Sequence, residues 1–535
     1  MPLQLRNLVL APGEPESTLM LKAARRLSID ESRFISFQLV RKGLDARNKR
    51  NIHYVCTVRF ELSDEQELSA RFGDDPDLCV LDVDETHTFP RLQTNERIVI
   101  VGAGPAGLFT ALRLAEYGIS ATMIERGRPV EERLKDVQRF WSTGELDTES
   151  NVQFGEGGAG TFSDGKLTTR VNDPHIRYVL RKLVDFGAPP EIACLAKPHI
   201  GTDRLRNVVR NIREYLTGSG FLVRFGSRLT DVVLHEGRVA AIRVNECGEL
   251  PCGILVMAPG HSARDTYELL LRLGVRLEAK PFAVGVRIEH PQELINRIQY
   301  GRAADRNLPP ADYSLAWNNR QTGRSCYSFC MCPGGVVVAS ASETGGVVTN
   351  GMSAYQRNAP YANSALVVNV KIEDFASPHP LAGVDFQRSL EKQAFVAGGG
   401  GYKAPAQNLA AFMGKEAKRA FSSYRPGISE SDLNSFLPGF VTETLREGVT
   451  AFDRKMRGFI TAEATLIGTE TRTSAPVRIM RRADFQSISV SGLYPAGEGA
   501  GYAGGIMSAA LDGIRVADAI ARQLQAKGNR LMAEG

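Results

Sequence analysis

Residues 97–125 read RIVIVGAGPAGLFTALRLAEYGISATMIE, and this stretch carries the clearest structural signal in the chain. In its opening run, Arg97–Val101, the four residues after the arginine are all apolar, as a buried parallel strand requires. A glycine-rich turn follows, and the next residues place apolar side chains on one helical face. Gly118 ends this segment, where a left-handed residue costs little, and residues 119–124 form a second apolar run. The stretch predicts a β–α–β unit.

The turn inside this unit has the GxGxxG pattern of a dinucleotide site. The first glycine permits the tight turn, the second lets the backbone approach a pyrophosphate, and the third lets helix and strand pack closely. The start of the helix offers unpaired N–H groups to the phosphates. Glu125 ends the second strand, where its carboxylate can accept ribose hydroxyls, which favours FAD or NAD over NADP. The predicted cofactor residues here are Gly102, Gly104, Pro105, Ala106, Gly107, Glu125 and Arg126.

A second glycine-rich segment, nearly 400 residues later, favours FAD over NAD. Residues 492–499 read GLYPAGEG. They resemble the late segment of many flavoproteins in which an acidic residue after a glycine binds the ribityl chain. The following helix would direct its positive end at the flavin and stabilise charge that develops on reduction. The residues predicted to contact FAD here are Gly497, Glu498, Gly504, Gly505 and Ile506.

Two further stretches are consistent with a flavin site. Residues 155–166, GEGGAGTFSDGK, form a polar, glycine-dense loop, which we expect to line the cofactor with backbone N–H groups; an ordinary surface loop is the alternative. Ala258-Pro259-Gly260 follows an apolar strand and resembles the Ala-Thr-Gly turn of glutathione-reductase-like flavoproteins, with Pro in place of Thr. These stretches add Gly157, Gly158, Ser163, Lys166 and Gly260 to the predicted cofactor residues.

Taken together, these segments resemble the FAD-dependent oxidoreductases of glutathione-reductase-like fold. More narrowly, the chain resembles a family of FAD-dependent dehydrogenases or oxidoreductases that carry an extra N-terminal α+β module and have no settled reaction. The narrower resemblance rests on RKGLDARNKRN (41–51), NVQFGEGGAGTFSDGKL (151–167), KPFAVGVRIEHP (280–291), YSFCMCPGG (327–335), TRTSAPVRI (471–479) and GLYPAGEGAGYAGGIMSAALDGIRVA (492–517). The resemblance implies FAD as cofactor and does not identify a substrate.

The order of the segments predicts a chain of α/β and α+β class. Residues 1–90 form a small α+β module in this interpretation, with strands over 3–10, 34–42 and 52–62 and a helix over 16–27. A Rossmann-like FAD-binding domain takes residues 97–275 and 485–530. A β-rich substrate domain over 276–484 interrupts it.

Composition narrows the class of protein. The chain has 535 residues, long enough for several folding units, and eight cysteines, too few for a secreted disulfide framework. No apolar run approaches the ~20 residues of a membrane span. The sequence therefore predicts a cytoplasmic protein, and the histidines show no spacing typical of a metal site. The net charge of +5 does not require a nucleic-acid partner, although the basic segment Arg41–Arg50 would allow one.

Four residues are candidates for contact with a substrate. Cys330 and Cys332 alternate along an expected strand, so both side chains should face one side; packing, a redox pair and an iron–sulfur ligand role all remain open. Arg472 could bind a substrate carboxylate through a bidentate pair of hydrogen bonds, contact FAD or brace a domain interface. Lys403, like Lys166, is a candidate proton donor.

These observations favour an FAD-dependent oxidoreductase that transfers hydride between flavin N5 and a small-molecule substrate. No second nucleotide fingerprint follows the first, so NADH or NADPH would bind only transiently. Two alternatives remain: an RNA-associated flavoprotein that uses the basic N-terminal module, and a non-catalytic flavin sensor or interaction protein.

Overall fold

A computed structural model describes residues 2–63, 75–81, 89–302, 305–416 and 418–534 of the chain. One of its sheets is parallel and has five strands in the order β22-β11-β5-β6-β7. The strands are β5 (Ile98–Val101), β6 (Thr122–Ile124), β7 (Leu222–Arg224), β11 (Ile254–Met257) and β22 (Leu493–Pro495). All four residues of β5 are buried, as the apolar run predicts. The C-terminal segment thus pairs beside strands that lie far earlier in the chain.

Alternation along β5 divides the core of this sheet into two layers. Ile98 and Ile100 pack with the helices on one face, which are α3 (Pro105–Glu116), α5 (Ile176–Asp185), α6 (Thr202–Gly218) and α12 (Ile506–Glu534). Val99 and Val101 pack on the other face with α7 (Arg264–Arg272) and the antiparallel sheet β8 (Leu229–His235), β9 (Arg238–Val244) and β10 (Gly248–Pro251). This division follows from the period of two along a strand.

The second strand of the β–α–β unit is shorter than predicted. It begins at Thr122 rather than at residue 119. The N–H of Ile119 still bonds Leu114 O at 3.0 Å, so this residue completes the end of α3 beyond the left-handed Gly118. Ile119 is buried as a helix-capping contact and not as a strand residue.

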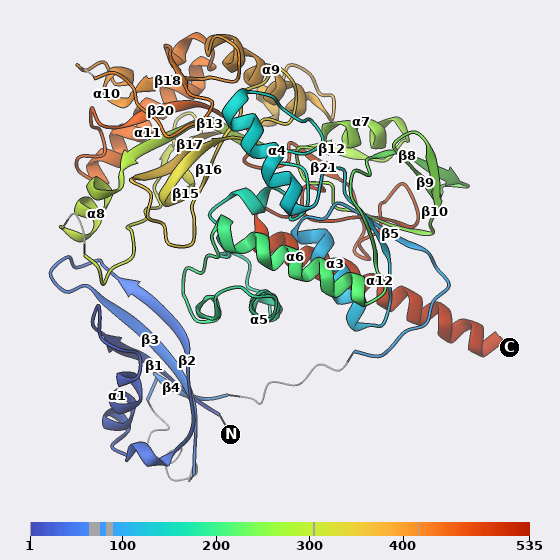
Figure 1. Ribbon diagram of the computed structural model, residues 1–535, viewed down its shortest axis with the longest axis horizontal. Coiled ribbons are helices and arrows are strands. Elements are labelled where there is room, and N and C mark those ends of the chain that lie inside the picture. The colour runs from blue at the N-terminus through green and yellow to red at the C-terminus, as the bar shows by residue number, and fades with distance from the viewer. Residues whose placement is uncertain (1, 64–74, 82–88, 303–304, 417, 535) are drawn as a thin grey trace.

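A β-rich layer follows in sequence and lies at the upper left of Figure 1. Its eight-stranded sheet has the path β14-β15-β17-β13-β20-β18-β19, with β16 paired to β15. Apolar side chains from this sheet and from its helices form one continuous core. The strands are β13 (Phe282–Pro291), β14 (Ala316–Asn319), β15 (Arg324–Ala339), β16 (Thr349–Met352), β17 (Tyr361–Val370), β18 (Ala404–Asn408), β19 (Ile428–Glu430) and β20 (Thr465–Glu470); the helices are α8 (Gln292–Tyr300), α9 (Ala382–Ala397), α10 (Leu409–Phe412) and α11 (Gly439–Lys455).

Several elements lie outside the large sheets and their covering helices. Helix α4 (Val130–Thr143) precedes the glycine-dense loop, and the strands β12 (Leu277–Ala279) and β21 (Val477–Ile479) pair with each other. The remaining short helices are η1 (Glu31–Arg33), η2 (Ala159–Phe162), η3 (Pro190–Ala193), η4 (Ile372–Asp374) and η5 (Leu433–Ser435).

The N-terminal module is a four-stranded sheet with one helix, at the lower left of Figure 1. It contains β1 (Leu3–Leu10), α1 (Thr18–Leu27), β2 (Phe34–Asp45), β3 (His53–Leu62) and β4 (Leu78–Val80). Lys42 in β2 exchanges backbone hydrogen bonds of 2.7 and 2.9 Å with Cys194 and Ala196, which joins the module to the rest of the chain. The predicted fold class, a Rossmann-like unit with a β-rich insertion and an N-terminal α+β module, is confirmed. Within the described residues, no helix combines the length and apolar character needed to cross a membrane.

Candidate functional site

A deep cavity lies where the parallel sheet meets the β-rich layer. Its empty volume is about 1570 Å³, counting the open solvent at its mouth. Both layers contribute to its walls: the turn after β5 and the loop after β11 from one side, and β15, β16 and the end of β20 from the other. Of the predicted site residues, those that line it are Gly102, Gly104, Pro105, Ala106, Glu125, Arg126, Gly158, Ser163, Lys166, Gly260, Cys330, Cys332, Arg472, Glu498, Gly505 and Ile506.

The three fingerprint glycines have different structural reasons to be glycine. Gly102 has φ of 100°, and a Cβ atom there would lie 2.2 Å from Ala258 O. A Cβ at Gly107 would lie 1.9 Å from Gly102 O, so no side chain fits there, and Gly107 is outside the cavity lining. Gly104 is different, because its Cβ would meet only Gly158 Cα, at 3.8 Å, inside the cavity. Its missing side chain keeps space open between two backbones, as a pyrophosphate requires.

Glu125 is buried and fastens three backbone segments around the cavity. Its Oε1 accepts the N–H groups of Gly127 and Gly155 at 3.0 and 2.9 Å, and its Oε2 accepts the N–H of Ala103 at 2.9 Å. A carboxylate offers about four acceptor positions, so this arrangement leaves one for a ligand hydroxyl. The sequence suggested that both ribose hydroxyls could bind here; the geometry leaves room for one without displacing a backbone donor.

Arg126 lines the cavity but its guanidinium is already paired. It forms ion pairs with Glu149 at 2.8 Å and Asp265 at 2.9 Å, and it lies 4.2 Å from the centre of the Phe154 ring. Any contact between Arg126 and a cofactor would therefore be made by a guanidinium that two carboxylates already hold in place.

Arg133, which belongs to none of the sequence motifs, holds the glycine-dense loop of residues 155–166 in place. Its side chain is fully buried and donates to the backbone carbonyls of Asn151, Val152, Gly155, Glu156 and Gly158. Burial lowers the pKa of Arg133 to about 10. The loop is thus an internal, fixed part of the site, and the surface-loop alternative is wrong. Gly157 lies outside the cavity lining and packs against the loop itself, where a Cβ would lie 2.1 Å from Thr161 Oγ1.

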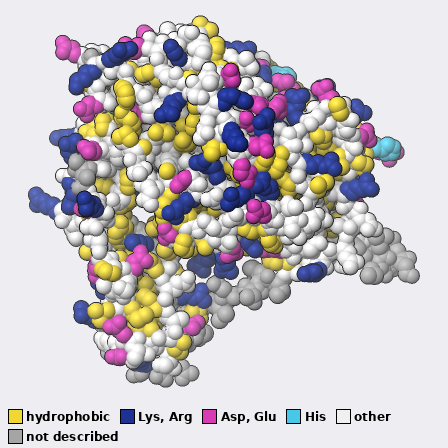
Figure 2. All heavy atoms as spheres, viewed as in Figure 1, with side chains coloured by type: hydrophobic (Ala, Val, Ile, Leu, Met, Phe, Trp, Pro, Cys, Tyr) yellow, Lys and Arg dark blue, Asp and Glu magenta, His cyan; other side chains and the backbone are white. Residues whose placement is uncertain are grey.

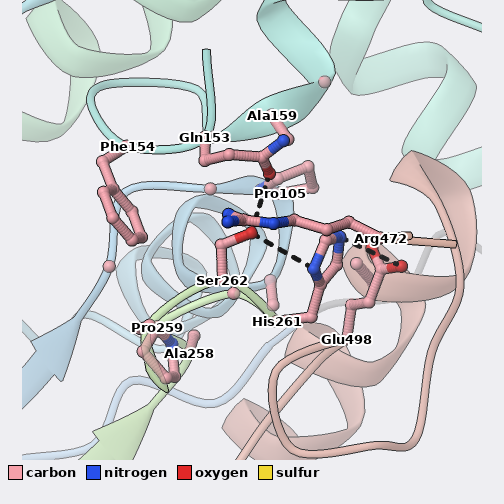
Figure 3. Close-up of a pocket in the computed structure, with 18 of the residues that line it drawn as sticks. Pro105, Gln153, Phe154, Ala159, Ala258, Pro259, His261, Ser262, Arg472 and Glu498 are labelled. Carbon is pink, nitrogen blue, oxygen red and sulfur yellow. Dashed lines mark hydrogen bonds and ion pairs between the residues drawn. The ribbon is translucent and has the colours of Figure 1, made fainter. Parts of the chain in front are cut away.

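A chain of polar side chains crosses one wall of the cavity (Figure 3). Gln153 donates to Ser340 Oγ at 2.5 Å and accepts from Ser262 at 3.0 Å. Because the Ser262 proton is used there, the contact of 3.3 Å between Ser262 Oγ and His261 Nδ1 assigns the ring proton to Nδ1. His261 Nε2 is then a bare acceptor, and it faces Glu498 Oε1 at 3.9 Å.

The ionisation of this wall is set by burial. Burial, aided by the nearby cations Arg472 and Arg264, lowers the pKa of His261 to about 3, so the imidazole is neutral. Burial raises the pKa of Glu498 to about 7, against the Gly505 N–H and Lys280, which favour the ionised form. Near neutral pH, Glu498 therefore exchanges a proton beside a neutral histidine that can accept a hydrogen bond.

The start of α12 forms another part of the wall. Gly505 and Ile506 line the cavity, and a Cβ at Gly504 or Gly505 would meet nothing within 4 Å. Gly504 is outside the lining, although its N–H bonds Ser508 Oγ at 2.9 Å at the start of the helix. Gly497 is also behind the wall, where a Cβ would lie 2.6 Å from Ala106 Cβ. The two predicted cofactor segments, 102–107 and 497–506, therefore meet in space.

The proposed substrate residues fall into three different settings. Cys330 and Cys332 line the cavity from β15, and the strand prediction there is correct, although their alternation is interrupted by a bulge. Arg472 lines the cavity but is bound to Glu391, with Nε–Oε1 and Nη2–Oε2 distances of 3.1 and 3.0 Å. Lys403 is exposed in the loop before β18 and lies outside the lining.

Arg472 belongs to a buried ionic cluster that spans the two layers. Glu391 in α9 also accepts from Arg264 in α7, at 2.7 and 2.9 Å, and Arg264 reaches Glu343. Paired guanidiniums on either side of Glu391 hold the pKa of that carboxyl far below its usual range. The geometry favours the bracing interpretation of Arg472 over the carboxylate-binding one, because its donors already have a carboxylate.

The basic segment of the N-terminal module is partly neutralised. Lys42 pairs with Glu16 at 2.7 Å and Arg47 pairs with Asp45. On the face shown in Figure 2, basic and acidic side chains are interspersed. Nucleic-acid contact through 41–50 stays a prediction. Among the described residues, no group of three or more His, Cys, Asp or Glu side chains is placed to hold a metal ion.

Comparison with known proteins agrees with this geometry. Residues 95–135 match an FAD binding domain, residues 281–473 match the C-terminal domain-like part of FAD-dependent proteins, and residues 2–61 match a domain of unknown function. A Clostridium beijerinckii protein named "Uncharacterized protein" is 46% identical over 528 residues, which is 97% of this chain and 98% of the relative.

Similar solved structures are distant in sequence. The flavin-dependent brominase Bmp2 is 14% identical, with a TM-score of 0.36 over 81% of this chain and 80% of that one. L-Proline dehydrogenase from P. horikoshii is 12% identical, with a TM-score of 0.35 over 81% of this chain and 95% of that one.

Proposed function

Because this chain belongs to a family of FAD-dependent proteins and has FAD as its cofactor, we propose that it is an oxidoreductase acting on a small molecule. In this proposal residues 97–275 and 485–530 bind FAD, and residues 276–484 provide the substrate domain. FAD supplies a flavin ring whose N5 accepts or donates a hydride. The chain's own residues hold the cofactor, exclude water and position the substrate.

The observation that carries the proposal is the cavity shared by the two layers. Gly102, Gly104 and Glu125 line it from the parallel sheet, while Cys330 and Glu470 line it from the β-rich sheet. A dinucleotide bound by its pyrophosphate at the first wall would extend toward the second. A substrate held by the β-rich sheet would therefore meet the flavin end in a protein-enclosed space.

The residues present fit a dinucleotide. The N–H groups of Ala106 and Gly107 precede the first helical bond of α3, Leu108 N–H to Gly104 O, so the helix leaves them without a carbonyl partner. Gly104 and Gly158 keep the facing backbones clear, and a Cβ at Gly260 would meet open space. We assign the pyrophosphate to the α3 end, a ribose hydroxyl to Glu125, and the ribityl and flavin end to Glu498 and the start of α12.

In this proposal the Glu498 carboxyl also helps to balance charge on the cofactor. The positive end of α12, together with a protonatable carboxyl, would compensate negative charge at the pyrimidine edge of a bound flavin. Neutral His261 lies beside that carboxyl, with Nε2 3.9 Å from Oε1, and a small closing movement would let Nε2 accept a hydrogen bond from the protonated form.

An anaerobic titration of the flavin-loaded protein tests this function. The flavin absorbance should bleach on addition of NADH or NADPH, and it should return when an electron acceptor is admitted. Bleaching by only one of the two nicotinamides would identify the donor. A flavin that neither nicotinamide nor dithionite reduces would contradict an oxidoreductase and favour the sensor alternative.

A further inference from the structure

Two thiols lie in the β-rich wall of the cavity, and the function proposed above gives them no role. Cys330 is exposed to the cavity and Cys332 is buried beside it. Both belong to β15, and both are free thiols in this structure. Cys326, on the same strand, is fully buried outside the cavity lining, where Gly448 packs directly against it. The strand therefore separates a packing cysteine from two that face ligand space.

The backbone around these thiols departs from a regular strand. In the pairing with β17, Phe329 is opposite Ala365 and Cys332 is opposite Asn363, so β15 has one extra residue between these pairs. Cys330 lies in this bulge with φ of 44°, a left-handed conformation that is unfavourable for a residue other than glycine. Such bulges occur often beside active sites, where they re-aim a side chain. Here the bulge interrupts the alternation that would otherwise place both side chains in one regular row.

Arg287 fixes the two cysteines relative to each other. Its Nη2 donates to Cys330 O at 2.6 Å and contacts Cys332 Sγ at 3.6 Å. The rest of this fully buried guanidinium is held by Glu470 and Asn363, both at 2.9 Å. The Cys332 thiol also donates to Cys330 O at 3.3 Å. One buried cation thus contacts both the Cys330 carbonyl and the Cys332 thiol of this bulged strand segment at the cavity.

We propose that Cys330 and Cys332 form a dithiol–disulfide pair that exchanges two electrons with the FAD held in the same cavity. The inference rests on the proposed function, because it needs a redox-active FAD. In the oxidative direction the two S–H bonds break and one Sγ–Sγ bond forms, and two electrons and two protons pass to FAD. The reverse transfer cleaves the Sγ–Sγ bond and restores both thiols.

The charged surroundings of the pair determine its pH dependence. Enclosure by protein raises the pKa of Cys330 to about 11, while Lys166 and Arg287 act in the opposite direction. Burial also raises the pKa of Cys332, which faces Arg287, Lys166, Arg357 and the carboxylate of Asp164. At neutral pH both groups are protonated, and since the thiolate is the reacting form, exchange should accelerate as pH rises.

Electron counting on the flavin-loaded protein tests the proposal. The protein oxidised in air should need twice as much dithionite per FAD for full reduction as its Cys330→Ser variant. Denatured oxidised protein should show two fewer reactive thiols than the eight cysteines of the chain, and reduced protein should show all eight. Peptide mass analysis should find the linkage between Cys330 and Cys332.

Two control variants separate this effect from the loss of any cysteine. Cys247→Ser removes an exposed surface thiol and Cys326→Ala removes the packing thiol of β15; both should keep the doubled dithionite demand. Equal dithionite demand in the wild type and Cys330→Ser, with all eight thiols reactive after oxidation, would overturn the dithiol pair and leave the oxidoreductase standing. A wild type that holds no reducible FAD would instead overturn the proposed function.

Discussion

His261 Nε2 lies 3.9 Å from Glu498 Oε1, and this pair brings the loop after β11 next to the turn that follows β22 at the wall of the cavity. The imidazole is neutral, and its Nδ1 proton is directed to Ser262. Burial favours the protonated form of Glu498, and the neutral imidazole beside it adds no charge that would oppose this. Glu498, with a pKa of about 7, thus lies beside the proposed flavin end of the cavity.

The raised pKa of Glu498 predicts a pH-dependent stability of the protein without FAD. The folded-state pKa of Glu498, about 7, is raised above the ordinary 4.5. Its contribution is present in full below pH 4.5 and is lost as pH rises through 7, up to on the order of 3 kcal/mol. Glu498→Gln should lack this loss, so its unfolding temperature relative to the wild type should increase from pH 5 to pH 8. A pH-independent difference would contradict the assignment.

Glu125 should contribute to both loop geometry and cofactor retention. Glu125→Gln replaces an acceptor oxygen by an NH₂ group that opposes the backbone N–H donors, and it should weaken FAD binding by roughly 1–3 kcal/mol. Flavin fluorescence during titration of the apoprotein measures this directly. Glu149→Gln is the matched control, because Arg126 keeps Asp265 as partner and affinity should change little. Unchanged affinity in Glu125→Gln would count against the ribose assignment.

The fingerprint glycines should respond differently to alanine. Gly107→Ala forces a Cβ to within 1.9 Å of Gly102 O, and we expect it to cost roughly 1–3 kcal/mol of stability. Gly104→Ala meets only an ordinary contact of 3.8 Å, so the apoprotein should be nearly as stable as the wild type while FAD binding falls. Thermal unfolding of both apoproteins, together with FAD titrations, checks this. Normal FAD affinity in Gly104→Ala would place the pyrophosphate elsewhere.

Arg472 should behave as a brace between the layers. Arg472→Met leaves the buried Glu391 with one guanidinium partner, Arg264, in place of two, and removal of one partner from such a cluster costs roughly 3–5 kcal/mol. The thermal unfolding temperature should fall accordingly. If the variant kept its stability and lost only turnover, Arg472 would be a substrate-binding residue instead.

Local patterns were sufficient to predict the parts of the fold that local physics determines. The turn 102–107 predicts its own strand and helix because its glycine spacing is local, and the contact that excludes a side chain at Gly107 comes from Gly102 in the same turn. The module of residues 1–62 was predictable for the same reason, since its alternating and helical periodicities are complete within each element. Even the meeting of the two cofactor segments followed from the resemblance of residues 492–499.

The remaining site residues depend on contacts between segments far apart in the sequence. Arg133 and Arg287 sit in ordinary helix and strand sequence, and only the folded chain shows the carbonyls and thiols that surround them. The pairing of Arg472 with Glu391 joins residues about 80 positions apart, so the sequence alone does not show that the guanidinium already has a carboxylate partner. The bulge at Cys330 was equally hidden, because it is defined by its register against β17.

The absorption spectrum of the purified protein, followed by mass identification of the released chromophore, tests the central claim most directly. The account predicts a yellow protein that holds about one FAD per chain, and that loses this FAD in Gly104→Ala while it remains folded. A colourless protein that takes up no FAD after incubation with an excess would contradict it.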